Sequence, residues 1–334
     1  MMTDKIQAGH GSGGKLMNDM ISNVIRKILG NESIQLDDSA VLSVPPGQIV
    51  FTTDTFVVTP IVFPGGDIGS LAVNGTVNDL AVMGARPLYL SCGLILEEGF
   101  DMETFTQIMR SMRKEADAAG VQIVTGDTKV VPRGKGDRIY INTTGIGVLE
   151  NELQRREIAI GDKIIINGTI GDHGVTIMAE RNQLSFSRGL QSDCAHLNHM
   201  IAGVTKKFPE SIKFMRDATR GGVASVLNEI VKDRPFSAML VEENLPVKEE
   251  VHGMCDILGL DPLYVANEGK VIFIVEKDRA GDILKILKED AHGKDAAVIG
   301  EITGEFKGKA YVETDIGGKR ILPLLLEEQL PRIC

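Results

Sequence analysis

Tryptophan is absent from this chain of 334 residues, and only 4% of its residues are aromatic. A platform on which bases or sugars stack uses such rings, so we expect none here. Basic residues are also in the minority, with 36 Lys and Arg against 46 Asp and Glu and a net charge of −10. A nucleic-acid surface relies on clustered positive charge. We therefore expect no nucleic-acid partner.

Long apolar runs are lacking too, and none reaches the roughly 20 residues of a membrane span. The N-terminal segment MMTDKIQAGH has no apolar stretch of the kind found in signal peptides. Hydrophobic residues make up 43% and charged residues 25%, a balance typical of soluble domains. These features predict a cytoplasmic protein without a membrane partner.

Cysteine is scarce, with four residues at positions 92, 194, 255 and 334. None stands near enough to another in sequence to indicate a zinc knuckle or a CxxC redox pair. We expect free thiols, three of them in or near the core. Cys334 is the last residue of the sequence, and because proteins usually avoid exposed thiols, it needs a functional explanation.

The length favours two α/β domains over one. Periodicity in the first half predicts helices over residues 14–29, 68–84 and 102–119 and extended segments over 49–53, 88–96, 121–125 and 138–148. The charged stretch 150–160 is predicted to cross to a second unit. That unit is expected to hold strands over 163–167, 270–275 and 296–303, a glycine-bearing turn over 168–174, and helices starting near 221 and covering 279–290.

Glycine is plentiful, and Gly9-His10-Gly11-Ser12-Gly13-Gly14-Lys15 formally fits the GxxxxGK pattern of a P-loop. Two observations exclude a P-loop. Leu16 stands where a Mg²⁺-binding Ser or Thr belongs, and residues 1–8 do not form a buried strand. The segment is either a plain flexible loop or a flap whose backbone N–H groups close over phosphates.

Aspartates stand beside several predicted elements. Asp38 precedes residues 39–44, Asp54 ends the strand 49–53, Asp79 lies on the helix 68–84, Asp127 follows the strand 121–125, and Asp217 precedes Thr219-Arg220-Gly221-Gly222. Strand ends are where α/β folds place ligand sites, although single aspartates also cap helices and make turns. Together they favour a shared Mg²⁺–phosphate site.

Two asparagines, Asn74 and Asn78, lie four residues apart beside Asp79 in an otherwise apolar helix. Buried amides are costly unless they are hydrogen-bonded. A metal ion or a nucleotide would satisfy them, and a bond to a neighbouring loop is the simpler alternative, above all for Asn74.

Several separated motifs, in order, resemble the PurM-like ATP-binding superfamily, which includes aminoimidazole ribonucleotide synthetase, selenophosphate synthetase and thiamine monophosphate kinase. They are Asp37-Asp38-Ser39-Ala40, Thr53-Asp54, residues 78–85, Gly126-Asp127-Thr128, Gly171-Asp172-His173-Gly174 and residues 217–222. The resemblance implies an α/β (α+β) fold with an N-terminal ATP-binding and dimerisation domain of mixed sheet (1–152), a C-terminal α/β domain (153–320) and a flexible tail (321–334).

The resemblance also implies a site for ATP and Mg²⁺. Nucleotide contacts are expected from Gly11, Gly13, Gly14, Lys15, Asp38, Asn74, Asn78, Asp127, Thr128 and Arg220. The metal ligands are expected among Asp38, Asp54, Asp79, Asp127 and Asp217.

The ending Pro331-Arg332-Ile333-Cys334 is similar to that of the HypE family within this superfamily. In that family a HypF-like carbamoyltransferase loads the terminal thiol, and ATP-dependent dehydration turns the carbamoyl group into a cyano group for [NiFe]-hydrogenase. A HypC–HypD complex then accepts the cyano group. The resemblance implies a homodimeric carbamoyl dehydratase that acts on its own Cys334.

Dehydration removes two N–H protons, which requires bases. The resemblance points to Glu268 and Lys129, with His173 as a further catalytic candidate and His10 as a contact to phosphate or tail. The simpler alternatives are a solvated carboxylate for Glu268, a counter-ion of Asp127 or of phosphate for Lys129, and a bond to the backbone for His173.

Two other functions stay open at this stage. A small-molecule kinase of the thiamine monophosphate kinase type has no use for a terminal thiol, and a non-catalytic maturation scaffold would turn over no ATP. A selenophosphate synthetase is disfavoured, because that family usually carries a reactive Cys or Sec in the N-terminal glycine-rich loop and residues 9–15 contain neither.

Overall fold

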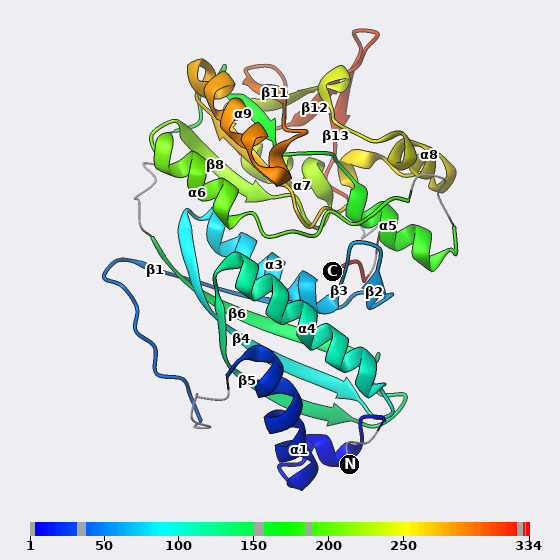
Figure 1. Cartoon of the computed structure of the whole chain (residues 1–334). Helices are drawn as coiled ribbons and strands as arrows, with labels where there is room; N and C mark the ends of the chain where they lie inside the picture. The colour runs from blue at the N-terminus through cyan, green and yellow to red at the C-terminus, as the bar shows by residue number, and fades with distance from the viewer. Residues whose placement is uncertain (1–3, 32–37, 150–156, 185–188, 326–329, 331) are drawn as a thin grey trace.

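Two β-sheets with helices packed on them follow one another along the chain (Figure 1). The structure, a computed structural model, describes residues 4–31, 38–149, 157–184, 189–325, 330 and 332–334. The first sheet has the strand order β1-β6-β4-β5, and the second has the order β13-β12-β9-β11-β7-β10-β8. Among the described residues, no helix is both long and apolar enough to cross a membrane.

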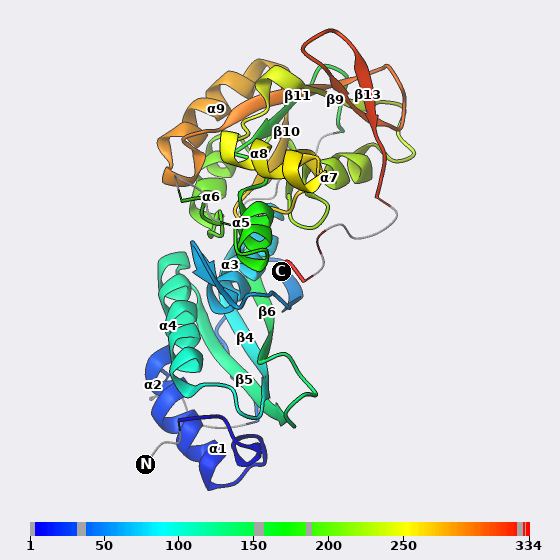
Figure 2. The same ribbon diagram turned by 90° about the vertical axis from the view of Figure 1, so that its right-hand side faces the viewer.

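The first sheet is mixed, as expected, because β4 and β5 run parallel while its other neighbours are antiparallel. Its strands are β1 (Ile49–Phe56), β4 (Ala85–Glu97), β5 (Gln122–Val131) and β6 (Ile139–Leu149). The helices α3 (Ile68–Val82) and α4 (Met102–Ala119) pack against it (Figure 2). A short ribbon of β2 (Val62–Phe63) and β3 (Gly66–Asp67) precedes α3.

Helix α4 forms where its apolar spacing predicts it. Phe105, Ile108 and Met112 are fully buried, so one stripe of the helix faces the core. Asp101 caps its first turn by accepting a hydrogen bond from the Thr104 N–H, and Gly120 ends it with a φ of 74°.

Two strands run further than their sequences suggest, and this corrects the placement of two aspartates. Asp54 lies inside β1 opposite Thr143, and Asp127 lies inside β5 opposite Gly93. Both strands are edges of the sheet, where only alternate side chains need burial, so their polar stretches do not look like strands. These aspartates therefore project from strands and do not follow strand ends.

The N-terminal helix is confirmed, with one irregularity. It consists of α1 (Lys15–Met20), a π-helical turn η2 (Ile21–Ile25) and α2 (Arg26–Leu29), and Gly30 ends it with a φ of 70°. Before it lies only a 3₁₀ turn, η1 (Ala8–Gly11), and no strand is present among residues 4–8 beyond one isolated bridge at Lys5. The exclusion of a P-loop is thereby confirmed.

The second unit contains more regular structure than its sequence predicts. Its strands are β7 (Lys163–Ile166), β8 (Ile212–Asp217), β9 (Ser237–Val241), β10 (Val271–Val275), β11 (Ala297–Thr303), β12 (Ala310–Glu313) and β13 (Lys319–Leu322). Its helices are α5 (Asp172–Arg181), α6 (Asn198–Lys207), α7 (Gly222–Val231), α8 (Glu249–Leu258) and α9 (Ala280–Glu289), with the 3₁₀ turns η3 (Glu242–Asn244), η4 (Pro262–Tyr264), η5 (Lys277–Arg279) and η6 (Ala291–Gly293).

The expected turn at residues 168–174 instead opens helix α5. Gly171 precedes the helix with a φ of 85°, and Gly174 lies within it. A Cβ on Gly174 would come within 2.5 Å of the Val265 side chain, so this glycine serves close packing. The glycines that suggested a turn thus belong to a tightly packed helix start.

The end of the chain returns to the junction of the two units (Figure 2). β13 extends to Leu322, so the tail begins after that residue and not at 321. Leu330 and Ile333 are buried in the same core cluster as Phe56 and Val175. The tail is docked in this structure, and the mobility that we expect of it stays a prediction.

Candidate active site

The thiol of Cys334 lies within hydrogen-bonding reach of the Glu268 carboxyl group. Glu268 stands just before β10 and is only 3% exposed, and its Oε1 has no hydrogen-bond partner among the described residues. Burial raises the pKa of Glu268 well above its usual value, and the neighbouring Asp193 raises it further. Burial likewise raises the pKa of the Cys334 thiol, so the docked sulfur is protonated. A buried carboxyl with a free oxygen next to a thiol is a candidate proton acceptor.

The tail is held mainly through its backbone. The Val57 N–H donates to a main-chain carboxylate oxygen of Cys334 over 3.1 Å, and the Thr59 N–H donates to the carbonyl of Arg332 over 3.3 Å. The guanidinium of Arg181, on α5, donates to the same Arg332 carbonyl. The tail thus bonds to both units at once, which fixes the thiol at their junction.

His173 anchors the tail. Its Nε2 lies 2.8 Å from the carbonyl oxygen of Ile333, and its Nδ1 lies 2.8 Å from the hydroxyl of Ser192. A carbonyl can only accept, so Nε2 carries the hydrogen and Nδ1 accepts from Ser192. Burial lowers the pKa of His173, consistent with this neutral form. The expected catalytic histidine is therefore at the site, but its geometry makes it a positioning residue.

Three of the five expected metal-binding aspartates gather beside the thiol. Burial raises the pKa of Asp54 on β1, of Asp79 on α3 and of Asp217 at the end of β8. The charge of Asp79 raises the pKa of Asp54 and of Asp217 further, and the charge of Asp54 also raises that of Asp217. The hydroxyl of Thr52 donates to Asp79 Oδ2 over 2.8 Å, which ties α3 to β1. Arg220, exposed before α7, partly offsets the negative charge at Asp54 and Asp79.

This acidic group fits a divalent cation. Burial and the charges of Asp79 and Asp54 raise the pKa of Asp217 to about 7, so the carboxylates stand together at an electrostatic cost. A Mg²⁺ ion would relieve that repulsion with the oxygen ligands it prefers. Among the described residues, no three His, Cys, Asp or Glu side chains are close enough to hold a metal alone, so phosphate or water oxygens would complete the shell.

The two asparagines of α3 behave differently. Asn78 Nδ2 donates to the carbonyl of Ala195 over 2.9 Å and to that of Glu268 over 3.3 Å, and its Oδ1 accepts from the Leu197 N–H. It is satisfied by the neighbouring loop, the simpler of the two readings. Asn74 Nδ2 donates to Glu115 over 3.3 Å, while its Oδ1 is buried without a partner among the described residues. Of the two asparagines, Asn74 is thus the one whose side-chain oxygen has no partner among the described residues.

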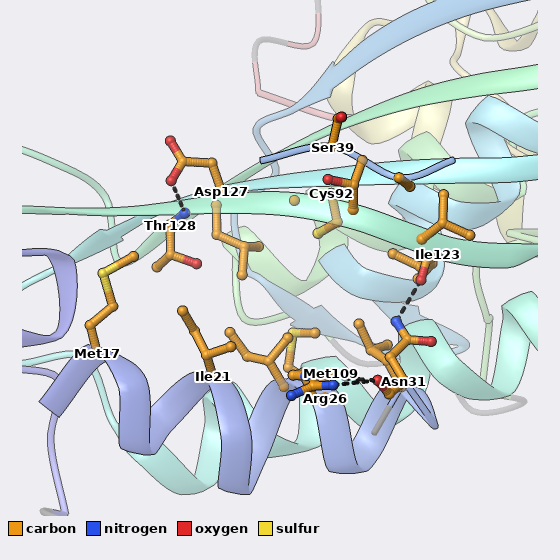
Figure 3. A pocket seen from close by; sticks show the side chains of 17 residues that line it. Met17, Ile21, Arg26, Asn31, Ser39, Cys92, Met109, Ile123, Asp127 and Thr128 are labelled. Atoms are coloured by element: carbon orange, nitrogen blue, oxygen red, sulfur yellow. Dashed lines mark hydrogen bonds between the residues drawn. The ribbon is translucent and has the colours of Figure 1, made fainter. Parts of the chain in front are cut away.

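Apart from the residues around the thiol, a cavity lies between the N-terminal helix and the first sheet (Figure 3). It is a cavity of about 170 Å³. Apolar side chains from the helix and the sheet form its walls, among them Met17, Ile21 and Ile123. Polar groups of Arg26, Asn31, Ser39, Asp127 and Thr128 stand at its edges. An apolar slot with polar groups around it suits a planar ligand that carries charged substituents.

Around this slot the expected nucleotide residues are partly assembled. Asp127 and Thr128 line it, and Asp38 is an exposed neighbour of the lining Ser39. Gly11 presses on β5, because a Cβ there would lie 2.5 Å from the Val130 N–H nitrogen. Gly13, Gly14 and Lys15 lead into α1, so the glycine-rich segment adjoins the slot without lining it.

His10, the expected contact to phosphate or tail, is buried and bonded locally, since its Nδ1 accepts from the Gln7 N–H.

Lys129 pairs with Asp127, its Nζ lying 2.5 Å from Oδ2, and both side chains are mostly exposed. This ion pair lowers the pKa of Asp127. The structure therefore shows the counter-ion arrangement for Lys129 and places it away from Glu268 and Cys334. β5 and β1 are opposite edges of the sheet, three strand spacings or about 14 Å apart. Within one chain, the cavity beside the N-terminal helix and the residues around the Cys334 thiol are therefore separate.

The sequence reasoning missed Asp193, Lys270 and Arg181. Asp193 Oδ2 accepts from Lys270 Nζ over 2.8 Å in a pair that is almost fully buried. The sequence shows that Lys270 stands two positions after Glu268, but Asp193, the partner of Lys270, is 77 positions away. No local pattern announces such a contact.

Known proteins resemble this chain over nearly its whole length. The chain matches the family of AIR synthase related proteins. Residues 36–149 match its N-terminal domain, and residues 159–313 match its C-terminal domain. The carbamoyl dehydratase HypE of Azotobacter vinelandii is 46% identical over 98% of this chain and 97% of its own length. A crystal structure of hydrogenase maturation protein HypE in complex with ATP has a TM-score of 0.93 at 45% identity, covering 98% of this chain and 99% of that one. A HypE–HypF complex has a TM-score of 0.78 at 43% identity, covering 93% and 99%.

Proposed function

The chain belongs to the HypE family of carbamoyl dehydratases, and from this premise we propose that it dehydrates a carbamoyl group on its own Cys334. The product is a thiocyanate that supplies the cyano ligand for the iron of [NiFe]-hydrogenase. One observation carries the proposal: the thiol of Cys334 is docked against a buried carboxyl group that has a free oxygen. A kinase acting on a small molecule would not need that contact.

The proposed chemistry balances in two steps. In the first, the carboxamide oxygen of the S-carbamoyl group attacks the γ-phosphorus of ATP, the bond to the β-phosphate oxygen breaks, and one N–H proton leaves. The products are ADP and an O-phosphorylated imidate. In the second, the C–O bond breaks, the remaining N–H proton leaves, and phosphate departs from a C≡N group. Phosphorylation turns a poor leaving group into a good one.

Each residue at the thiol has a part in this scheme. Glu268 takes an N–H proton, because it is buried and lies at the sulfur that carries the carbamoyl group. His173 and Arg181 hold the tail backbone, so the carbamoyl group is presented in one orientation. Arg220, whose charge acts on Cys334, is placed to stabilise the phosphate that leaves. Lys129 lies away from the thiol within one chain, paired with Asp127, and we keep it as a second base or electrostatic group that would act at the phosphates.

ATP is proposed to bind with its base in the slot beside α1 and η2 and its phosphates toward Asp127 and Thr128 (Figure 3). The glycine-rich segment before α1 then closes over the phosphates. The apolar walls support this placement, because a purine buries two flat faces. Mg²⁺, held by aspartates and phosphate oxygens, would neutralise charge that develops on the transferred phosphoryl group.

Replacing Asp79 with alanine is expected to weaken binding of Mg·ATP about tenfold, roughly 1.4 kcal/mol, because one carboxylate of the acidic group is lost. Calorimetric titration with and without EDTA measures this, and the difference between variant and parent should vanish in EDTA. Asp117→Ala, which removes an exposed aspartate of α4, is the matched control. Unchanged affinity in Asp79→Ala would remove Asp79 from the metal site.

A homodimer is proposed to form through the open face of the first sheet. On that face Phe51 is 67% exposed and lies opposite Ile146, and Ile95 is 44% exposed opposite Tyr140. Such exposed apolar neighbours are typical of an interface. Pairing of two sheets would also bring a second nucleotide slot toward each thiol, which the separation within one chain requires.

Phe51→Glu is expected to give a monomer, because a charge would be buried in the interface. Light scattering after size-exclusion chromatography measures the mass. The monomer should still accept a carbamoyl group on Cys334 and should lose ATP-dependent dehydration. Ile257→Glu, at a 76% exposed site on α8, controls for a surface charge and should stay dimeric. A fully active monomer would contradict the shared site.

Two partners follow from the proposal. A HypF-like carbamoyltransferase loads the thiol, and a HypC–HypD complex receives the cyano group. The supporting observation for the first is the crystal structure of a HypE–HypF complex among the chain's structural neighbours. Both partners need the sulfur outside its dock.

The experiment that tests the function is mass spectrometry of the C-terminal peptide after incubation with a carbamoyl donor system and ATP. The proposal expects a carbamoyl adduct on Cys334 that loses one water only when ATP is present. A carbamoyl adduct that persists with ATP, without ATP turnover, would indicate a scaffold. An unmodified thiol together with ATP hydrolysis stimulated by a small molecule would indicate a kinase.

A further inference from the structure

Asp193 binds three consecutive residues around Glu268 with one carboxylate. Its Oδ1 accepts the Glu268 N–H over 3.1 Å, and its Oδ2 accepts the Gly269 N–H over 3.3 Å. The same Oδ2 lies 2.8 Å from Lys270 Nζ, in a pair whose side chains are 3% and 9% exposed. The segment that carries Glu268 is therefore fixed by a buried ion pair.

The other side of the Glu268 residue is held as well. Asn78 donates to the Glu268 carbonyl over 3.3 Å and to the Ala195 carbonyl over 2.9 Å. A Cβ on Gly269 would stand 1.9 Å from the Asp193 carbonyl oxygen, so the two loops are in direct contact. Glu268 is thus clamped at its N–H and at its carbonyl, and its side chain is directed by loops rather than by a helix or strand.

The titratable groups that face Glu268 come from four parts of the chain. Asp193 lies in the loop before α6, Asp217 at the end of β8 and Asp54 on β1, while the thiol of Cys334 approaches from the tail. After burial, Asp193 is the largest of these influences on the pKa of Glu268, and its effect is to raise it. The ammonium of Lys270 lowers the pKa of Asp193, so Asp193 remains ionised although it is buried.

We propose that Asp193 is a positioning residue for the dehydration: it fixes Glu268 against the thiol, and its charge, maintained by Lys270, favours the transfer of a proton onto Glu268. This inference rests on the proposed role of Glu268 as the proton acceptor. It assigns Asp193 and Lys270 to the reaction although neither touches the carbamoyl group.

The experiment follows dehydration in single-turnover assays on protein already carbamoylated at Cys334, across pH. Glu268 must be ionised to accept a proton, so the rate rises with pH through its pKa and is lost as pH falls. In Asp193→Asn the negative charge is gone, the pKa of Glu268 falls, and the acid limb is expected to move to lower pH by about 1 to 3 units. The plateau rate should fall, because a weaker base accepts a proton less readily.

A second variant keeps the test independent of folding. Asn at position 193 would leave the Lys270 ammonium buried and unpaired, which destabilises the loop. Asp193→Asn/Lys270→Met removes both charges and nearly keeps the shape. The acid limb of this double variant is expected between that of the parent protein and that of Asp193→Asn. In Asp193→Asn the Lys270 ammonium remains without its partner and lowers the pKa of Glu268 further, and the double variant lacks that ammonium.

Asp172→Asn is the matched control. Asp172 lines the same polar cavity of about 290 Å³ as Asp193, is 2% exposed, and pairs with Lys248 over 2.7 Å. Its carboxylate bonds to Thr169 and Lys248, and among the described residues it makes no hydrogen bond to residues 268–270. Its loss should therefore leave the midpoint of the acid limb in place.

The outcomes separate this inference from the function it rests on. An acid limb that stays in place in both Asp193 variants, while Glu268→Gln has lost the limb, would overturn the role of Asp193. An acid limb that persists in Glu268→Gln would instead show that Glu268 is not the titrating base, and both assignments would fail. Loading of Cys334 by the carbamoyltransferase verifies in each variant that the protein is folded.

Discussion

Replacement of Cys334 by alanine is expected to abolish formation of the cyano group completely, because the atom that carries the carbamoyl group is gone. The variant should otherwise resemble the parent protein. The tail is held through the main-chain oxygens of residues 332–334, and a change of side chain leaves these bonds in place. Mass spectrometry of the C-terminal peptide detects the product, and thermal unfolding and light scattering report fold and dimer.

Cys255→Ala provides the matched control for the Cys334 variant. Cys255 is a buried thiol on α8, and burial raises its pKa to about 11. Its replacement tests whether loss of a cysteine other than Cys334 also affects formation of the cyano group. It should keep full cyano-group formation. Loss of ordered structure in Cys334→Ala, or retention of a cyanylated product, would count against the carrier role.

Glu268→Gln is expected to slow dehydration about 10²- to 10⁴-fold, the usual contribution of a general base. Glutamine keeps the shape of the side chain and its carbonyl oxygen but cannot take up a proton at neutral pH. Carbamoylation of Cys334 should be unaffected, so the carbamoyl adduct should accumulate in the presence of ATP. Stopped reactions analysed by mass spectrometry give the rate.

The pH dependence sharpens the Glu268 experiment. The pKa of Glu268 is raised in the folded protein, so the ionised, active form is present above that raised pKa and disappears below it. The parent protein should therefore lose rate toward acid, and Glu268→Gln should be slow and flat over the same range. Glu301→Gln, on β11, carries the same chemical change away from the thiol and should keep both rate and profile. A fast Glu268→Gln enzyme would be incompatible with our assignment.

Local pattern was enough for the elements with strong periodicity. Helix α4 and the N-terminal helix ending at Gly30 follow directly from apolar spacing and glycine position. The family resemblance named both Glu268 and Cys334, and the fold brings their side chains together, while their catalytic roles stay a prediction. These features depend on residues near one another in sequence or on matched motifs.

Other features depend on contacts that a sequence does not display. Asp54 and Asp127 look alike as acidic residues near strands, but the order β1-β6-β4-β5 places them at opposite edges of the sheet. That order is set by how whole strands pair, so the expected single group of aspartates divides into two. For His173 the sequence leaves open a catalytic role or a bond to the backbone, and only the fold identifies the backbone partner as the Ile333 carbonyl at its Nε2.

The docked thiol imposes an order of events on the protein. Sulfur attacks as thiolate, and in the dock the raised pKa of Cys334 keeps it as the protonated thiol. On the proposed mechanism, loading therefore happens while the tail is away, and a tail that has returned empty is expected to be inert to electrophiles and oxidants. The pocket that we propose for the dehydration of a loaded tail would thus protect an unloaded one. The rate at which iodoacetamide alkylates Cys334 would then measure the fraction of time that the tail spends outside.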